Sequence, residues 1–495
     1  MSKLLESRIG EETSVTTPNS TLSASQASPS KSNNMSPVKE ARSPYTPNLF
    51  PHPDKKEVHT LNRTNMGTFQ DSLRAPVHRW FTYPAGFSYR AVEEAFRSYH
   101  IKAGMTVYDP FAGTGTTNVV AKQHGVNSFG VEAHPFIQFV ARTKLFWEFD
   151  FRVLLRDIDN LIASIQRAIT TQDTASISVD KIFPELVCKC YRQEKLARLY
   201  LCREAINALP PEPFRDFAKL GLTNLLRSAA DVATGWPYIA PKKQKNGNTS
   251  KASASNNVVE LLRRQLYQMH GDLQSMRRAS TPARHATLIS GDSRQRQDSI
   301  ESESVDLAFT SPPYLNNYDY ADRTRLETYF WGEATTWGDI TQKVRTRLIM
   351  SATTQINRKD FDEASLLSDD FRKTVPQITD ELSLKANKLS GLRLTKGGKK
   401  SYDIMVAGYF NDMLRVVRET FRVLKPGGSF VLILGDSAPY GVYIPTDTYL
   451  GEIGKAVGFA KYDVEELRAR GGKWKDNPQR HDVALKECIL TLYKE

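Results

Sequence analysis

The stretch "DLAFTSPPYLNNYDYAD" at residues 306–322 joins an apolar run to a pair of prolines. The run at 307–309 predicts a buried strand, and Pro312 and Pro313 would end it abruptly. Proline has a fixed φ and lacks a backbone donor, so two in a row indicate a rigid exit from a strand. A serine precedes the prolines and a tyrosine follows them, which predicts a stiff corner carrying polar and aromatic groups.

A second chemical pattern is the loop "DPFAGTG" at 109–115, between a predicted strand and a predicted helix. Its glycines let a ligand approach the backbone closely, and the helix start presents free amides. The third glycine of a dinucleotide fingerprint is absent. Glu132 ends the next predicted strand, near the roughly twenty-residue offset of an acid that binds ribose hydroxyls.

This combination indicates a cofactor with a ribose and little or no phosphate. Asp109 would repel a phosphate but could hold an amino group, so S-adenosylmethionine fits. A turn with two glycines and an unrelated surface acid is the alternative when the pattern stands alone. The cofactor-binding residues predicted from this region are Asp109, Phe111, Ala112, Gly113, Thr114, Gly115 and Glu132.

The tripeptide "GDS" occurs at 291–293 and again at 435–437. Asp292 follows a predicted parallel strand, where such sheets bind ligands, and could accept a hydrogen bond from an adenine amino group. Asp436 ends a later predicted strand and could line the same cleft.

At this point the sequence resembles a known family. "TSPPY" at 310–314 is similar to the catalytic motif of amino-group DNA methyltransferases, in which a small polar residue precedes two prolines and an aromatic residue. "DPFAGTG" and "GDS" precede it in the order of that family. "RWFTYPAGFS" at 79–88 resembles a further cofactor-side motif and adds Tyr83, Pro84 and Ala85 to the predicted cofactor site. The resemblance covers roughly 80–135, 286–335 and 403–495.

The resemblance implies an α/β fold, a Rossmann-like methyltransferase sheet with helices on both faces, and S-adenosylmethionine as methyl donor. An exocyclic amine is a poor nucleophile because its lone pair is delocalised into the ring. Acceptors at Ser311 Oγ and the Pro312 carbonyl would favour a tetrahedral nitrogen, and Pro313 would help to fix them. Tyr314 would stack on a base flipped out of the duplex. None of the four cysteines follows a proline, which excludes the nucleophile of a cytosine C5 enzyme.

The residue before the prolines indicates which base is methylated. In this family a serine usually accompanies cytosine N4 methylation, whereas aspartate or asparagine is typical of adenine N6 enzymes. Ser311 therefore favours cytosine N4 in a sequence-specific enzyme, with adenine N6 as the alternative. An RNA or protein amine methyltransferase and a catalytically silent DNA-binding regulator are weaker alternatives. No nuclease motif is evident, so a cognate restriction endonuclease would be a separate protein, or there is none.

The 495 residues divide into six predicted parts. Residues 1–68 are expected to be a disordered tail, because residues 1–50 are rich in Ser, Thr, Pro and Asn. A mostly helical insertion and a polar segment interrupt the catalytic domain. Either could house target recognition, and the polar segment is the preferred candidate. The catalytic parts are 69–150, 286–337 and 401–495, the helical insertion is 151–285, and the target-recognition candidate is 338–400.

The formal net charge of +12 favours a polyanionic partner, and the resemblance specifies double-stranded DNA. Tyr318, Tyr320 and Arg323 follow the prolines and could contact the extruded strand. The four cysteines fit a reducing compartment and small buried side chains, and no metal site is predicted. Without a signal peptide or a membrane span the expected location is cytoplasmic. Candidate phosphate contacts lie at 242–245, 263–264, 277–278 and 396–400.

Overall fold

The computed structural model of the chain describes residues 65–83, 86–235, 239–241, 257–279, 285–316, 318–362, 365–470 and 483–495. All of these belong to one compact unit. The predicted disordered tail lies outside the described residues except for residues 65–68. This last part is ordered, because Met66 is 3% exposed and packs with α1 (Tyr89–Ser98) in the core.

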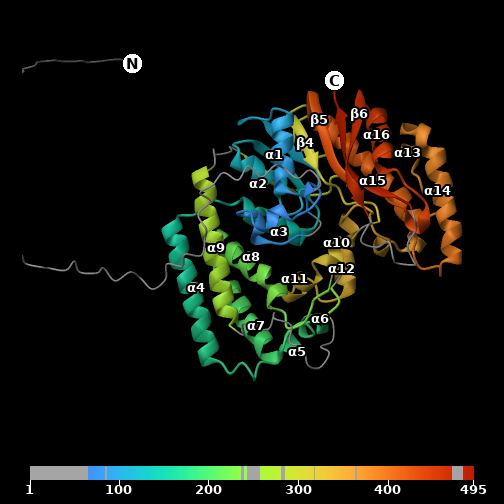
Figure 1. Cartoon of the computed structure of the whole chain (residues 1–495). Helices are drawn as coiled ribbons and strands as arrows, with labels where there is room; N and C mark the ends of the chain where they lie inside the picture. The colour runs from blue at the N-terminus through green and yellow to red at the C-terminus, as the bar shows by residue number, and fades with distance from the viewer. Residues whose placement is uncertain are drawn as a thin grey trace, which may run out of the picture. The chain divides into compact units, whose positions relative to one another are not determined.

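Seven strands form one mixed sheet in the order β3-β2-β1-β4-β5-β7-β6 (Figure 1). The first five strands in that order are parallel, and β7 runs antiparallel to both of its neighbours. This is the α/β fold that the sequence predicts. The strands are β1 (Thr106–Asp109), β2 (Asn127–Glu132), β3 (Ala286–Ser290), β4 (Val305–Thr310), β5 (Leu424–Gly435), β6 (Lys461–Arg470) and β7 (Leu485–Tyr493).

Apolar side chains of the central strands point alternately to the two faces of the sheet, so both faces are buried. In β4, Leu307 and Phe309 face one apolar cluster and Ala308 faces another, as the two-residue period of a strand requires. The first cluster contains α1 and α2 (Thr116–Gln123), and the second contains α15 (Tyr402–Val423) and α16 (Thr446–Val457). Helices therefore pack on both faces, and the strand preceding the prolines is buried between them.

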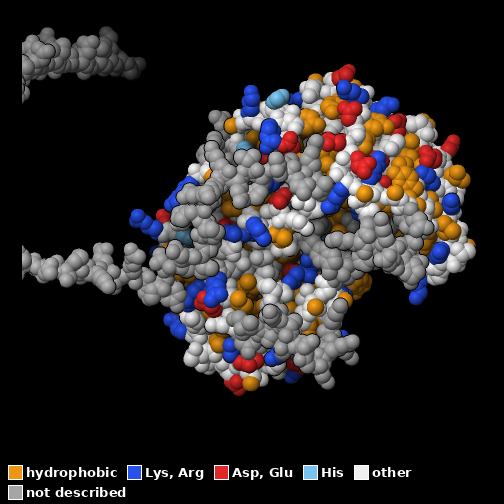
Figure 2. Space-filling model, viewed as in Figure 1, with side chains coloured by type: hydrophobic (Ala, Val, Ile, Leu, Met, Phe, Trp, Pro, Cys, Tyr) orange, Lys and Arg blue, Asp and Glu red, His pale blue; other side chains and the backbone are white. Residues whose placement is uncertain are grey.

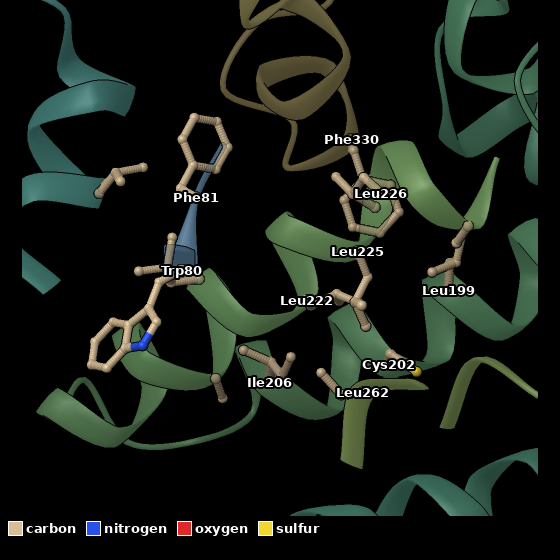
Figure 3. Close-up of a cluster of buried hydrophobic side chains, with 14 of the residues drawn as sticks. Trp80, Phe81, Leu199, Cys202, Ile206, Leu222, Leu225, Leu226, Leu262 and Phe330 are labelled. Atoms are coloured by element: carbon tan, nitrogen blue, oxygen red, sulfur yellow. The ribbon is translucent and has the colours of Figure 1, made fainter. Parts of the chain in front are cut away.

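The regular elements that the structure describes within residues 151–279 are all helices, and these helices share a core of their own. The core is made of residues such as Leu199, Leu222 and Leu262, and Trp80 and Phe330 join it from outside the helical region (Figure 3). Apolar residues at helical spacing supply the buried face, since packing rather than intrinsic propensity stabilises most protein helices. The helices are α4 (Phe151–Thr171), α5 (Val179–Ile182), α6 (Glu185–Cys188), α7 (Gln193–Asn207), α8 (Pro213–Ala229) and α9 (Val258–Ala279); α3 (Pro135–Leu145) of the catalytic region packs on α8.

The segment 338–400 is more regular than its weak periodicity indicates. It contains the 20-residue helix α14 (Pro376–Thr395), which packs against α15. Ile378, Leu382, Ala386 and Leu389 are buried at spacings of three and four residues, and polar residues surround them. The other elements from 320 to 375 are α10 (Tyr320–Arg323), α11 (Arg325–Phe330), α12 (Trp337–Lys343) and α13 (Asp369–Thr374), with short 3-10 turns between α12 and α13.

Among the described residues no helix is long and apolar enough to cross a membrane. The four cysteines are free; Cys190, Cys202 and Cys488 are buried as predicted, whereas Cys188 is only partly buried.

One carboxylate attaches the helical region to the catalytic region. Asp272 of α9 accepts hydrogen bonds from the Val77 backbone at 3.3 Å and the Trp80 indole at 3.0 Å, and forms an ion pair with Arg79. Its side chain is 4% exposed, so the charge depends on these partners.

We expect Asp272→Ala to destabilise the protein by about 3–5 kcal/mol, because a half-buried guanidinium and a buried indole N–H lose their acceptor. Glu260→Ala on the same helix is the matched control. Glu260 pairs with Arg264 at the surface, and its loss should change stability by less than about 1 kcal/mol. Chemical denaturation followed by circular dichroism measures both, and equal effects would contradict the anchoring role of Asp272.

Candidate active site

A cavity of about 780 Å³, counted with the solvent at its mouth, opens where β1, β2, β3 and β4 end. Parallel α/β sheets bind ligands at this edge. Nine of the predicted site residues line the cavity: Tyr83, Phe111, Ala112, Gly113, Thr114, Glu132, Asp292, Ser311 and Pro313. Pro84 and Ala85 lie outside the described residues, and Asp109, Gly115, Pro312 and Tyr314 are not part of the cavity wall.

Asp109 lies behind the cavity wall and is fully buried. Its carboxylate accepts hydrogen bonds from the Thr310 hydroxyl at 2.6 Å and the Thr117 hydroxyl at 2.7 Å, and from the Phe111 backbone N–H at 3.0 Å. Burial raises the pKa of Asp109 to about 6, against these three hydrogen bonds. These hydrogen bonds join the glycine loop to the residue before Ser311, and the contact of Asp109 with a cofactor amino group stays a prediction.

Gly115 has a structural position as well. Its φ is 82°, a left-handed conformation that favours glycine, and it caps the start of α2. A Cβ atom there would lie 3.3 Å from the Cβ atom of Ala141, so a side chain would press on α3. Gly115 thus shapes the loop while Gly113 faces the cavity.

Glu132 closes the glycine loop from the end of β2. One carboxylate oxygen accepts from the Gly113 backbone at 2.9 Å, and the other accepts from the His134 backbone at 2.7 Å. Burial raises the pKa of Glu132 to about 7, and the two backbone hydrogen bonds lower it. Each oxygen keeps a lone pair that a ligand hydroxyl can use.

Asp292 lines the cavity at the other end, after β3. Its carboxylate is paired with Arg294 at 2.7 Å, and Arg294 also reaches Asp412 of α15 at 3.1 Å. Asp412 in turn accepts a hydrogen bond from the Met350 backbone at 3.0 Å. An ion-pair network therefore links the predicted adenine acceptor to the segment 338–400.

Of the residues in the proline motif, Ser311 and Pro313 face the cavity and Pro312 is buried. Tyr314 is 8% exposed, and its hydroxyl donates to Glu487 of β7 at 2.9 Å. The Arg470 guanidinium lies 5.1 Å from the centre of the Tyr314 ring. A base that stacks on Tyr314, as predicted, therefore has to share or replace this cation–π contact.

The loop after Tyr314 is held by a buried ion pair. Asp319 begins α10 by accepting from the Ala321 and Asp322 backbones, and its other oxygen pairs with Arg345 at 2.6 Å. Both side chains of the pair are 1% exposed. The Asn316 backbone also donates to the Ser351 carbonyl at 2.9 Å, so residues 345–351 fix the loop.

Several residues of the cavity wall were missed by sequence reasoning. His134 follows Glu132 by two positions, so proximity to the predicted acid could have indicated it. Arg347, Leu348 and Ile349 come from the segment assigned to target recognition, and only the folded chain brings them to the cofactor side. Tyr320, predicted as a DNA contact, also lines the cavity.

The remaining predicted positions are dispersed. Asp436 accepts from the Tyr443 hydroxyl at 3.0 Å and the Lys486 backbone at 2.8 Å, and burial raises the pKa of its carboxyl. Arg263 and Arg264 pair with Glu260, and Arg277 donates to the Phe149 carbonyl. Lys and Arg side chains are interspersed with acidic ones on the face in Figure 2. The cluster 242–245 lies outside the described residues.

The cavity suits the cofactor that the sequence predicts. Glu132 and Asp292 are acceptors for ribose hydroxyls and an adenine amino group, and Phe111, Val131 and Ile349 supply apolar wall. Gly113 allows close approach of the backbone, and the two carboxylates disfavour phosphate. The sheet order and these cavity residues are consistent with a Rossmann-like methyltransferase that uses S-adenosylmethionine.

Comparison with known proteins gives the same class. A family model described as DNA methylase, of N6/N4 type, matches residues 15–142. The Type II methyltransferase M.BsoBI of Geobacillus stearothermophilus is 24% identical over 89% of this chain and 91% of its own. M.AvaI of Anabaena variabilis is 24% identical over the same shares, and M.MvaI of Kocuria varians is 21% identical over 82% of this chain and 86% of its own. These similarities and the α/β fold support an amino-group DNA methyltransferase of the N6/N4 type, a class whose methyl donor is S-adenosylmethionine.

We expect Arg345→Met to destabilise the protein by about 3–5 kcal/mol, because it leaves the Asp319 carboxylate buried without its cation. Cofactor affinity should fall as well, since Arg347 and its neighbours line the cavity from the same turn. Lys343→Met is the control, because the Lys343 ammonium makes one exposed hydrogen bond to the Glu333 carbonyl. Thermal unfolding with and without cofactor measures both, and an Arg345→Met protein as stable as the control would refute the role of the pair.

Proposed function

We propose that the protein methylates the exocyclic N4 of a flipped cytosine within a specific sequence of double-stranded DNA. The observation that carries this proposal is the position of Ser311 at the cavity wall, directly after β4 and before the two prolines. Only a base outside the duplex could bring its amine to this point.

The residues of the chain divide the work between binding and orientation. Glu132 and Asp292 would hold the ribose and the adenine of the donor, which supplies an electrophilic methyl group. Ser311 Oγ and the Pro312 carbonyl would accept hydrogen bonds from the target amine. Their positions are fixed before the base arrives, because Pro312 and Pro313 restrict the backbone and Thr310 is bound to Asp109. Little reorganisation is then needed at the transition state.

Adenine N6 is the second candidate, because the same acceptors would fit its amine. We assign target reading to residues 338–400, since residues 345–351 are attached to the loop that follows Tyr314. Lysines and arginines would position the phosphates without reading sequence. A cognate restriction endonuclease, if there is one, would be a separate chain.

Incubation of unmethylated genomic DNA with the protein and S-adenosylmethionine, followed by mass spectrometry of nucleosides, tests the proposal. N4-methyldeoxycytidine is expected. N6-methyldeoxyadenosine would replace the proposal by its alternative, and no transfer to any DNA would reject both. Methylation-sensitive sequencing of the same DNA maps the site.

On the mapped duplex, Ser311→Ala should lower kcat by about a hundredfold, because one pre-positioned transition-state partner is lost. The dissociation constant for S-adenosylmethionine, measured by titration calorimetry, should change by less than about threefold. Equal losses in turnover and in cofactor affinity would contradict the role given to Ser311.

Cofactor affinity should also depend on pH through Glu132. A ribose hydroxyl donates to the ionised carboxylate, so binding favours loss of the proton from a group whose pKa is about 7. Affinity should therefore increase as pH rises through 7, and the dissociation constant should be about tenfold higher at pH 6 than at pH 8. Glu132→Gln should bind more weakly at both pH values and lose most of this dependence. A wild-type affinity that is the same at both would contradict the assignment.

A further inference from the structure

The hydroxyl of Ser311 presents a problem that its position alone does not solve. A serine hydroxyl can donate one hydrogen bond or accept others, and it rotates to suit its neighbours. It helps the target amine only as an acceptor, because a hydroxyl proton aimed at the amine nitrogen would compete for its lone pair. Something has to direct that proton elsewhere.

The tyrosine that ends the proline motif is bound to a buried carboxylate. The Tyr314 hydroxyl donates to Glu487 at 2.9 Å, and the Arg468 guanidinium donates to the other Glu487 oxygen at 2.7 Å. The Glu487 side chain is 2% exposed, and a Cβ atom added to Gly67 would lie 2.4 Å from its carboxylate, so backbone covers it. Burial raises the pKa of the Tyr314 phenol well above its usual range, and Ser311, three residues earlier in the same corner, acts in the opposite direction, as a nearby hydroxyl donor does.

We infer that Glu487 is a positioning residue for methyl transfer, which acts through Tyr314 to make Ser311 an acceptor toward the target amine. An ionised carboxylate only accepts, so it takes the single proton of Tyr314. The Tyr314 oxygen can then only accept, so it takes the single proton of Ser311. The remaining lone pairs of Ser311 face the cavity. The inference rests on the proposed role of Ser311 and holds for a cytosine or an adenine amine.

Replacement of Glu487 by glutamine tests this chain of donors. Arg468 can only donate, so it should bind the new carbonyl oxygen and turn the amide NH2 toward Tyr314. Tyr314 would then donate to Ser311, and the Ser311 proton would point at the target amine. Glu487→Gln should therefore lower kcat by about a hundredfold. Tyr314→Phe should lower kcat by only about tenfold, because phenylalanine removes the acceptor of the Ser311 proton without turning that proton toward the amine.

The double variant distinguishes orientation from packing. Without the tyrosine hydroxyl, the glutamine cannot reverse the hydrogen bond between residue 314 and Ser311. The double variant should therefore be as active as Tyr314→Phe and about tenfold faster than Glu487→Gln. All three should bind S-adenosylmethionine with unchanged affinity by calorimetry, because neither residue lines the cavity. Glu466→Gln, on an exposed position of the neighbouring strand, is the control and should match the wild type.

Single-turnover rates on the mapped duplex give the result. A double variant slower than Glu487→Gln, or Glu487→Gln at the wild-type rate, would overturn the inference while the methyltransferase activity stands. If Glu487→Gln does not fold, Tyr314→Phe at the wild-type rate overturns it equally. Absence of transfer by the wild type would overturn the proposed function and this inference together.

Discussion

The buried carboxylate of Asp109 fixes the geometry on which the rest of the site depends. It sits at the end of β1 and binds the glycine loop through Phe111 and the end of β4 through Thr310. The glycine loop and the proline corner, the two parts proposed to bind the methyl donor and the target amine, are thereby held by one side chain. A buried carboxylate whose two oxygens both accept hydrogen bonds is harder to displace than a solvent-exposed contact in a flexible loop. Reactants that must align within a fraction of an ångström need such a common anchor.

The insertions are attached to this frame by the same kind of interaction. Asp272 ties α9 to the 3-10 turn at 78–80 and the residue before it. The pair Asp319–Arg345 ties the segment 338–400 to the loop that follows β4. Buried ion pairs add little net stability, yet they are costly to break, so they specify one arrangement. Residues 347–349 line the cofactor cavity as a result. A segment that reads DNA would in this way be in contact with the methyl donor as well.

The sequence predicted the sheet, the glycine loop, the proline corner and most of the cavity wall, because each depends on local spacing. Glu132 and Asp292 could be placed at strand ends from the βαβ pattern alone. The role of Asp109 could not, since its partner Thr310 lies some two hundred residues away in the chain. Arg347 to Ile349 and Glu487 escaped for the same reason, as only tertiary packing brings them to the site. The helix α14 was missed because its buried stripe is narrow and polar residues outnumber it.

The proposed chain from Glu487 to Ser311 explains why a serine would need support that other residues at this position do not. An ionised aspartate carries no proton to misdirect, and an asparagine has its carbonyl oxygen fixed opposite its amide nitrogen. A serine hydroxyl is shorter and rotates freely, so its acceptor face has to be imposed from outside. We infer that the buried Glu487 carboxylate, which can only accept, sets the orientation of this hydroxyl through Tyr314 without itself contacting the base. On this reasoning, exchange of Ser311 for aspartate should make activity independent of Glu487, because the proton that Glu487 controls would no longer be present.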